Sequence, residues 1–538
     1  MAHYILEDSK PLSQSIVWQF QRRFYQHQGI RAWNSGTVPY YITSNPYIAG
    51  AYAQVILGFL RDCLNGQSTD GAFPVLDTSQ PLYIVELGAG SGRFSFHFLK
   101  LFQRFYQKSS LASIPVKYIM TDISEDMVTY WRQHDGLRPF VEADMLDFAL
   151  FSAGQDTAIT LAESAQVLDA STIKNPMVVV ANYVFDSIPQ DCFYFERHRI
   201  YESLVKTLSS QPEEDYDDPE LMKRVFIRYE TKSTHASYYP DRDYNQLLRT
   251  YQNQLDETTF LFPKAPLDCI RHFREMTGDR LLFLSGDKGY IREESLYGWE
   301  DQELTVHGSF SMMVNYHAIA QYVQNVGGSV LQMSQKHDSL SVAGFLFGQH
   351  PHDYVETRAA YDTFIEMYGP DDFFVLKEGI EGTYKTFNPT QLLSFLKLSH
   401  WDAYLYLELA PALIEMVDDA DDLLKEALLR MAHDIWDMYY PIGEAEDVAF
   451  QLGMLLYKID FYTAAITFFK RSLEELGPHA STYYNLSLCH VGLDNMSEAE
   501  QWIDLTLELD PAFAGGQDLW REIQDALAAE AEETEIAE

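Results

Sequence analysis

The stretch LYIVELGAGSGRFS, from Leu82 to Ser95, decides the fold of this chain. A short apolar run ends in Glu86 and meets a glycine-rich turn, and an apolar run typical of a helix follows from Phe94 to Phe105. The pattern predicts a strand, a tight loop and a helix. The glycines of the turn are Gly88, Gly90 and Gly92. Glycines suit such a loop because the backbone turns sharply and lets a ligand approach closely, while the helix N-terminus offers free N–H groups. The stretch therefore indicates a nucleoside cofactor site, with an ordinary tight turn in a βα unit as the alternative.

Two classes of nucleoside cofactor use a loop of this kind. Dinucleotide enzymes have G-x-G-x-x-G, whereas the sixth position counted from Gly88 is Arg93 here. The form apolar-apolar-Glu-Leu-Gly-x-Gly-x-Gly instead resembles motif I of class I S-adenosylmethionine (SAM) methyltransferases. In that family the loop packs against the methionine part of the cofactor. The resemblance implies that Glu86 and the three glycines hold SAM, and NAD is the alternative cofactor.

Length and charge restrict the class of protein. At 538 residues and 46% apolar composition, the chain is expected to fold into two or three domains. It has 79 acidic and 39 basic residues and a formal net charge of −40. Such a surface repels phosphate backbones and anionic membranes, so we expect neither a nucleic acid nor a membrane as partner. Basic proteins are the more compatible partners.

The cysteines and the N-terminus indicate a cytoplasmic protein. The four cysteines are too far apart in sequence for a Cys-x-x-Cys motif, so no zinc or other metal site is expected. We expect them to be buried, reduced thiols. The N-terminus has no basic-then-apolar signal segment, and no apolar run approaches the length of a membrane span.

Two acidic residues follow the next predicted strands. Val116–Met120 reads as the second strand, and Asp122 near its end is placed to accept hydrogen bonds from ribose hydroxyls. The alternative is that Asp122 caps the helix that begins near Ser124. Phe140–Val141 is predicted as a brief third strand, followed by Asp144. The methyltransferase resemblance implies that Asp144 meets the adenine amino group, and a turn or cap residue is the alternative.

The second informative stretch is PMVVVANYVFDSIP. Met177–Val180 is predicted as a central buried strand because it is continuously apolar and β-branched. It leads into Asn182, Tyr183 and Asp186. Ligands of open α/β sheets bind at the carboxyl ends of such strands, so these three residues are the candidate catalytic residues on the acceptor side. Asn182 can both accept from and donate to a substrate nitrogen, or it can serve only as a turn residue.

The remaining apolar runs complete an α/β domain. Residues 1–80 are predicted as a helical N-terminal cap, in which the loop Tyr40–Tyr47 either covers the cofactor or only caps the sheet. Leu281–Leu284 is another core strand, and GGSVLQM and SLSVAGFLF are expected as an antiparallel pair that closes the sheet. The fold class is therefore α/β, with a Rossmann-like sheet of the class I methyltransferase type.

Five motifs in order narrow the resemblance. VELGAGSGRFS, TDIS, VANYVFDSIP, FLSGDKGY and GSFSMMVNYHAIA resemble the MidA-like family of SAM methyltransferases over about residues 15–350. That family includes an enzyme that methylates a protein arginine. The resemblance implies that Asp122 also holds SAM and that Asn182–Pro189 borders the substrate. Tyr183 replaces the family's Glu, while Met313 and Asn315 replace its His and Asp. A guanidinium is best oriented by carboxylates, so these replacements weaken the expectation of arginine as the acceptor.

The C-terminal part has helical periodicity from about residue 360. Small and bulky apolar residues recur with an offset of 34, as in the pairs Ala465/Ala499, Gly453/Ser487 and Phe469/Ile503. This period resembles tetratricopeptide repeats, whose concave face binds a peptide or another protein. A generic helical bundle is the alternative. The predicted organisation is a helical cap (1–80), a methyltransferase domain (81–350), a helical linker or degenerate repeat (351–445), two repeats (446–513) and a helical end with an acidic tail (514–538).

Three hypotheses for the function follow. The first is a SAM-dependent methyltransferase that transfers a methyl group to a nitrogen of a protein recruited by the repeats. The second is a non-catalytic SAM-binding adaptor or assembly scaffold. The third is a small-molecule methyltransferase in which the repeats only form a homodimer. Intact cofactor binding without turnover would favour the second hypothesis.

Overall fold

A computed structural model describes residues 3–65, 76–218, 220–302, 304–335, 339–348, 350 and 352–537. The chain divides into two compact units, Met1–Leu376 and Lys377–Glu538, which are described separately. Within the described residues, none of the helices is both long enough and apolar enough to cross a membrane.

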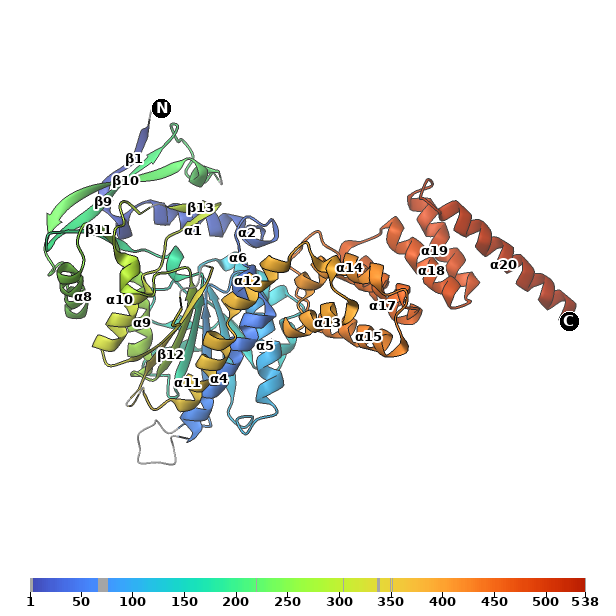
Figure 1. The fold of residues 1–538 in the computed structure, drawn as a ribbon, viewed down its shortest axis with the longest axis horizontal. Coiled ribbons are helices and arrows are strands. Elements are labelled where there is room, and N and C mark those ends of the chain that lie inside the picture. The colour runs from blue at the N-terminus through green and yellow to red at the C-terminus, as the bar shows by residue number, and fades with distance from the viewer. Residues whose placement is uncertain are drawn as a thin grey trace. The chain divides into compact units, whose positions relative to one another are not determined.

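The first unit is built on a seven-stranded sheet with the order β15-β16-β12-β7-β2-β3-β4 (Figure 1). Five neighbouring strands are parallel, and β16 is antiparallel to both β12 and β15. The predicted central parallel sheet and its closing antiparallel pair are thus confirmed. The strands are β2 (Leu82–Leu87), β3 (Val116–Asp122), β4 (Leu146–Leu150), β7 (Met177–Asn182), β12 (Leu281–Asp287), β15 (Ser329–Gln332) and β16 (Ser341–Phe347).

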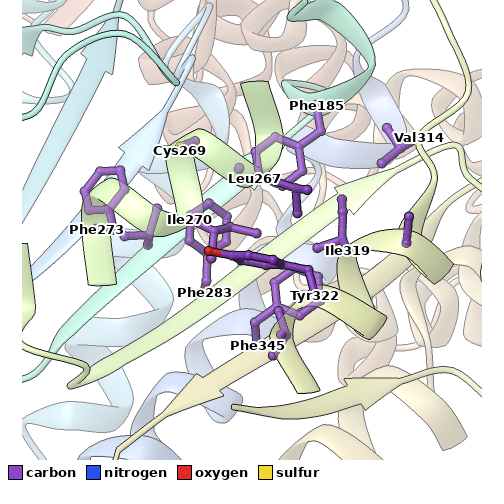
Figure 2. Close-up of a cluster of buried hydrophobic side chains, with 14 of the residues drawn as sticks. Phe185, Leu267, Cys269, Ile270, Phe273, Phe283, Val314, Ile319, Tyr322 and Phe345 are labelled. Atoms are coloured by element: carbon purple, nitrogen blue, oxygen red, sulfur yellow. The ribbon is translucent and has the colours of Figure 1, made fainter. Parts of the chain in front are cut away.

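Helices cover the sheet on both faces because each strand buries both sets of alternating side chains. On one face lie α4 (Pro46–Asn65), α5 (Arg93–Tyr106) and α11 (Val355–Tyr361), and α4 packs against both of the others. On the other lie α9 (Lys264–Thr277) and α10 (Tyr316–Asn325). Figure 2 shows the core of this second face, where Ile270, Phe283 and Tyr322 converge from α9, β12 and α10.

The N-terminal segment differs from the expected helical cap. Tyr4–Pro11 forms strand β1, which pairs antiparallel with β9 (Arg199–Ser209) in a second sheet. Three helices then follow: α1 (Val17–Gln28), α2 (Arg31–Asn34) and α3 (Tyr41–Ser44). The last of them lies within the segment Tyr40–Tyr47 that was expected as a loop. The strand was missed because its partner lies about 200 residues away and its own sequence is polar. The other strands of this sheet are β8 (Asp191–Glu196), β10 (Val225–Thr234) and β11 (Thr258–Phe262).

The expected third strand at Phe140–Val141 is also wrong. These residues lie in helix α7 (Arg138–Glu142), where Pro139 occupies the first turn, a position that proline favours. The third strand of the sheet is β4, which begins at Leu146. Between β3 and α7 the chain forms α6 (Glu125–Gln133).

The second unit consists of helices. Two helical hairpins are formed by α16 with α17 and by α18 with α19. Close approach in the first hairpin depends on Gly453, where a Cβ would lie 2.7 Å from the Phe469 ring. The six residues with the 34-residue offset are all buried. The helices are α13 (Pro389–Leu398), α14 (Ala403–Met416), α15 (Asp422–Asp437), α16 (Val448–Lys458), α17 (Tyr462–Leu476), α18 (Ala480–Gly492), α19 (Met496–Leu509) and α20 (Gly516–Ala537).

Candidate cofactor and acceptor site

A cavity of about 430 Å³ lies in the first unit, at the carboxyl ends of the parallel strands. Open α/β sheets bind their ligands at this edge. Its lining has three parts. They are the N-terminal segment between Ser13 and Ser44, the glycine loop with the end of β3, and the loops that follow β4 and β7.

The glycine loop has the backbone conformation that glycine alone adopts readily. Gly88, Gly90 and Gly92 have φ angles of +60°, +52° and +83°. These values lie in the left-handed region, which L-residues avoid. A Cβ on Gly90 would also lie 2.8 Å from Cζ2 of Trp33. The loop therefore presents bare backbone to the cavity, and the space beside it would be reduced by any side chain.

Two buried carboxylates flank the loop. Glu86, at the end of β2, accepts hydrogen bonds from the Ser95 hydroxyl and from Tyr118, whose hydroxyl lies at 2.8 Å. Burial raises the pKa of Glu86 to about 7. Asp122, at the end of β3, accepts from the backbone N–H of Ser124 at 3.1 Å and of Gly90 at 3.4 Å. Burial raises the pKa of Asp122 to about 6.

Aromatic residues of the N-terminal segment cover the glycine loop. The Trp33 ring lies against Gly90 and stacks with Tyr25 at 5.9 Å between centroids. The Tyr40 ring lies 5.1 Å from the Arg93 guanidinium, at the start of α5. Tyr40 also lines the cavity, whereas Tyr47 stacks on Phe373 outside it. The first part of the predicted Tyr40–Tyr47 loop thus covers the site and the last part does not.

Asn182 and Tyr183 both line the cavity at the end of β7. The Tyr52 hydroxyl donates to Asn182 Oδ1 at 2.8 Å. A Cβ on Gly286 would lie 2.7 Å from that oxygen and 2.8 Å from the Tyr52 hydroxyl, so glycine is needed to leave room for this hydrogen bond. Tyr183 has φ of +54°. Such strain in a residue other than glycine is typical of functional sites.

Asp186 lies behind the cavity wall instead of in it. It is buried, and Ser187, which does line the cavity, donates from its hydroxyl to Asp186 Oδ1 at 2.7 Å. Asp186 faces a second buried carboxyl group, Asp287, whose Oδ2 accepts from the backbone N–H of Phe185 at 3.1 Å. Burial raises the pKa of Asp186 to about 6, and burial beside Asp186 raises the pKa of Asp287 well above its usual range. The two groups therefore share a proton at neutral pH.

Asp287→Asn is expected to increase the free energy of unfolding at pH 8 by about 1–3 kcal/mol and to change it little at pH 5. Because both folded-state pKa values lie above those of the unfolded chain, the wild-type pair destabilises the fold increasingly as pH rises from about 4. Urea unfolding of the full chain at both pH values measures the difference. The exposed Asp126→Asn is the control. An equal effect of Asp287→Asn at both pH values would contradict proton sharing.

Asp144 does not reach the cavity. Its side chain is 88% exposed and accepts from Lys117 Nζ at 2.6 Å. The adenine expectation depended on a strand at Phe140–Val141, and the true strand ends later, so Phe151, Ser152 and Gln155 line the site there. The main residues missed from the sequence are Arg22, Tyr25 and Trp33, for which only the aromatic content of the N-terminal segment gave a signal.

Comparison with known proteins agrees with the cofactor prediction. Residues 72–333 match the model of a family described as "Putative S-adenosyl-L-methionine-dependent methyltransferase". The match covers the glycine loop, Asp122 and the β7 end, and confirms SAM as the cofactor of this domain. The cavity fits SAM because the glycine-loop backbone, without side chains, lies beside Asp122, a carboxylate at a position suited to ribose hydroxyls. The residues that would hold SAM are Glu86, the three glycines and Asp122. No curated protein matches the sequence.

Solved structures with some likeness to the chain are distant. A structure from Burkholderia thailandensis bound to S-adenosyl-homocysteine (SAH) has 14% identity and a TM-score of 0.39, covering 77% of this chain and 85% of that one. An uncharacterized protein from the same organism has 13% identity and a TM-score of 0.36, covering 77% and 84%. Magnesium protoporphyrin IX methyltransferase from Synechocystis PCC 6803, also with SAH, has 10% identity and a TM-score of 0.27, covering 61% and 98%.

Proposed function

We propose that this protein is a SAM-dependent methyltransferase that methylates a nitrogen of a protein substrate. The carrying observation is a cavity that adjoins both the glycine loop and the Asn182–Pro189 segment. SAM supplies an electrophilic methyl group on a sulfonium. The residues of this chain then have to position the acceptor and remove a proton. Asn182, held by Tyr52, and Tyr183 border the place where the acceptor would lie.

The proton from the acceptor nitrogen has a route into the protein. Ser187 borders the cavity and already donates its hydroxyl proton to Asp186. A proton taken up by the Ser187 oxygen can therefore be passed to the Asp186 carboxylate, whose pKa burial raises to about 6. A group of this pKa is ionised at pH 7 and can accept the proton. In this proposal Asp186 acts through Ser187 and does not touch the acceptor.

The helical unit is proposed to recruit the substrate, as tetratricopeptide-like repeats would. Residues 480–538 contain 14 Asp or Glu and a single basic residue, Arg521. An acidic surface of this kind attracts a basic protein segment and accelerates its encounter. The repeat interpretation rests on the 34-residue offset and on the two hairpins.

Calorimetric titration with SAH, SAM and NAD tests the cofactor, and transfer of labelled methyl from SAM to sets of lysine-, arginine-, histidine- and glutamine-containing peptides tests the reaction. Saturable SAH binding with transfer to one peptide class supports the proposal. Tight SAH binding without transfer to any peptide or small-molecule acceptor would favour the adaptor hypothesis. Absence of SAH binding by folded protein would exclude both. Sedimentation of the full chain tests the homodimer.

Reversing two exposed charges on α19, Glu498→Lys with Glu508→Lys, is expected to raise KM for a basic protein substrate about five- to tenfold. The values of kcat and of the SAH Kd should stay within twofold, because both side chains are exposed and lie outside the catalytic unit. Steady-state kinetics at low ionic strength measures the effect. A matched control reverses Glu142 and Glu300, two exposed acids of the first unit. Equal KM changes in both variants would indicate net charge alone, without recruitment by the helices.

A further inference from the structure

We propose that Arg22 binds an oxyanion, a carboxylate or a phosphate, carried by the methyl acceptor close to the atom that is methylated. This inference deepens the proposed function and rests on it. It would make Arg22 a specificity-determining residue of the same cavity.

The first observation is that Arg22 lacks an acidic partner. Arg22 projects from α1 into the cavity lining, is half-buried, and donates from Nη2 to the Ser152 hydroxyl at 2.9 Å. Within the described ranges no carboxylate forms an ion pair with it, although the chain has twice as many acidic as basic residues. The next residue, Arg23, pairs with Asp217 at 3.2 Å. A half-buried guanidinium without an anion keeps much of its capacity to bind one.

The second observation is the charge of the surrounding lining. Arg22 is the sole Lys or Arg among the described residues that line the cavity, and the two acids there, Glu86 and Asp122, belong to the glycine-loop side. Besides Ser152, which accepts a hydrogen bond from Arg22, the lining contributed by α1, the segment before it and the loop after β4 includes the neutral polar residues Ser13, Gln14, Gln19 and Gln155. A cationic acceptor such as a lone guanidinium meets repulsion here, whereas an oxyanion meets one strong donor and several weaker ones.

The third observation separates Arg22 from the cofactor's own carboxylate. Ser152 follows β4, whereas the glycine loop follows β2, two strands away in the order β2-β3-β4. Neighbouring strands are about 4.8 Å apart, so the two positions differ by roughly 10 Å along the sheet edge. If the glycine loop packs against the methionine part of SAM, its carboxylate lies on the far side from Arg22. The loop after β4 instead reaches the acceptor segment: a Cβ on Gly154 would lie 2.9 Å from the Ala265 carbonyl oxygen, and the Ala265 N–H donates to the Pro189 carbonyl at 3.1 Å. An oxyanion at Arg22 is therefore assigned to the acceptor.

The test uses the full chain, Arg22→Gln and the matched control Arg23→Gln. Calorimetry first measures binding of SAH and of 5′-methylthioadenosine, which lacks the amino-acid part. Glutarate and inorganic phosphate are then titrated separately into the SAH complex. We expect Arg22→Gln to weaken binding of the preferred anion at least about tenfold, as loss of one charge-assisted hydrogen bond predicts. Binding of SAH and methylthioadenosine should stay within twofold, and Arg23→Gln should match wild type.

Each other result has a defined meaning. Weaker binding of SAH but not of methylthioadenosine would assign Arg22 to the cofactor carboxylate, and weaker binding of both would assign it to the nucleoside. Either result overturns the proposal, as does a wild-type SAH complex that binds neither anion. Preference for glutarate indicates an acidic side chain, and preference for phosphate a phosphorylated acceptor. If Arg22→Gln is unfolded, Arg22→Lys should bind the anion weakly but measurably. Wild-type protein that fails to bind SAH would contradict the proposed function itself.

Discussion

Gly90→Ala is expected to lower the affinity for SAH about 100-fold. The added Cβ would lie 2.8 Å from the Trp33 ring, so either the ring moves into the cavity or the loop shifts away from the cofactor. The φ angle of +52° adds strain, because the left-handed region costs an L-residue roughly 1–2 kcal/mol. Calorimetry with SAH measures the effect directly. Gly90→Arg, which fills the site, should abolish binding.

Gly278 provides the matched control for this experiment. Its φ and ψ angles of +59° and +49° lie in the left-handed region, but nothing lies within 4 Å of the position that a Cβ would take there. Gly278→Ala should therefore destabilise the fold by a similar strain of roughly 1–2 kcal/mol while SAH affinity stays within twofold. If both variants lose affinity equally, backbone strain and not occupation of the cofactor space would be the cause.

The second large effect concerns pH. Binding of SAH is expected to be constant above about pH 7 and to weaken towards about tenfold per pH unit below pH 6. We propose that the ribose hydroxyls bind the ionised form of Asp122, and burial raises the pKa of this group to about 6 in the free protein. As pH falls through that pKa, a proton has to be released on binding and affinity drops. Asp122→Asn should lose at least about tenfold in affinity at pH 8 and show a flat profile.

Glu86 has to be separated from Asp122 in this measurement. Its pKa is raised to about 7, and it lines the same cavity. Calorimetry from pH 5 to 8 should therefore include Glu86→Gln, which is expected to keep the decline below pH 6. A steep decline that persists in Asp122→Asn would show that another group, Glu86 first, controls the pH dependence. The Asp122 assignment would then be wrong.

The features predicted correctly from the sequence are those that short stretches determine. In the glycine loop and the β7 run, a few neighbouring residues specify the local structure, so the strands, the turn and the edge of the cavity were placed correctly. Asp144 was misplaced because the helix Arg138–Glu142, with Pro139 in its first turn, lies where a strand was expected. Tyr25 and Trp33 were missed because their contacts depend on tertiary packing. Asp186 was expected at the acceptor, but the chain turns it inward to Asp287, a partner about 100 residues away.

The pairing of β1 with β9 has a consequence for synthesis of the chain. Tyr4 lies opposite Ser209, and the aromatic cover of the cofactor site follows β1 directly in sequence. Strand β1 therefore cannot pair until about 200 further residues have emerged from the ribosome, and closing so long a loop is slow. During that interval the glycine loop can already form, but the aromatic residues of the N-terminal segment do not yet cover it. The cavity is thus completed late in translation, after β9 has emerged.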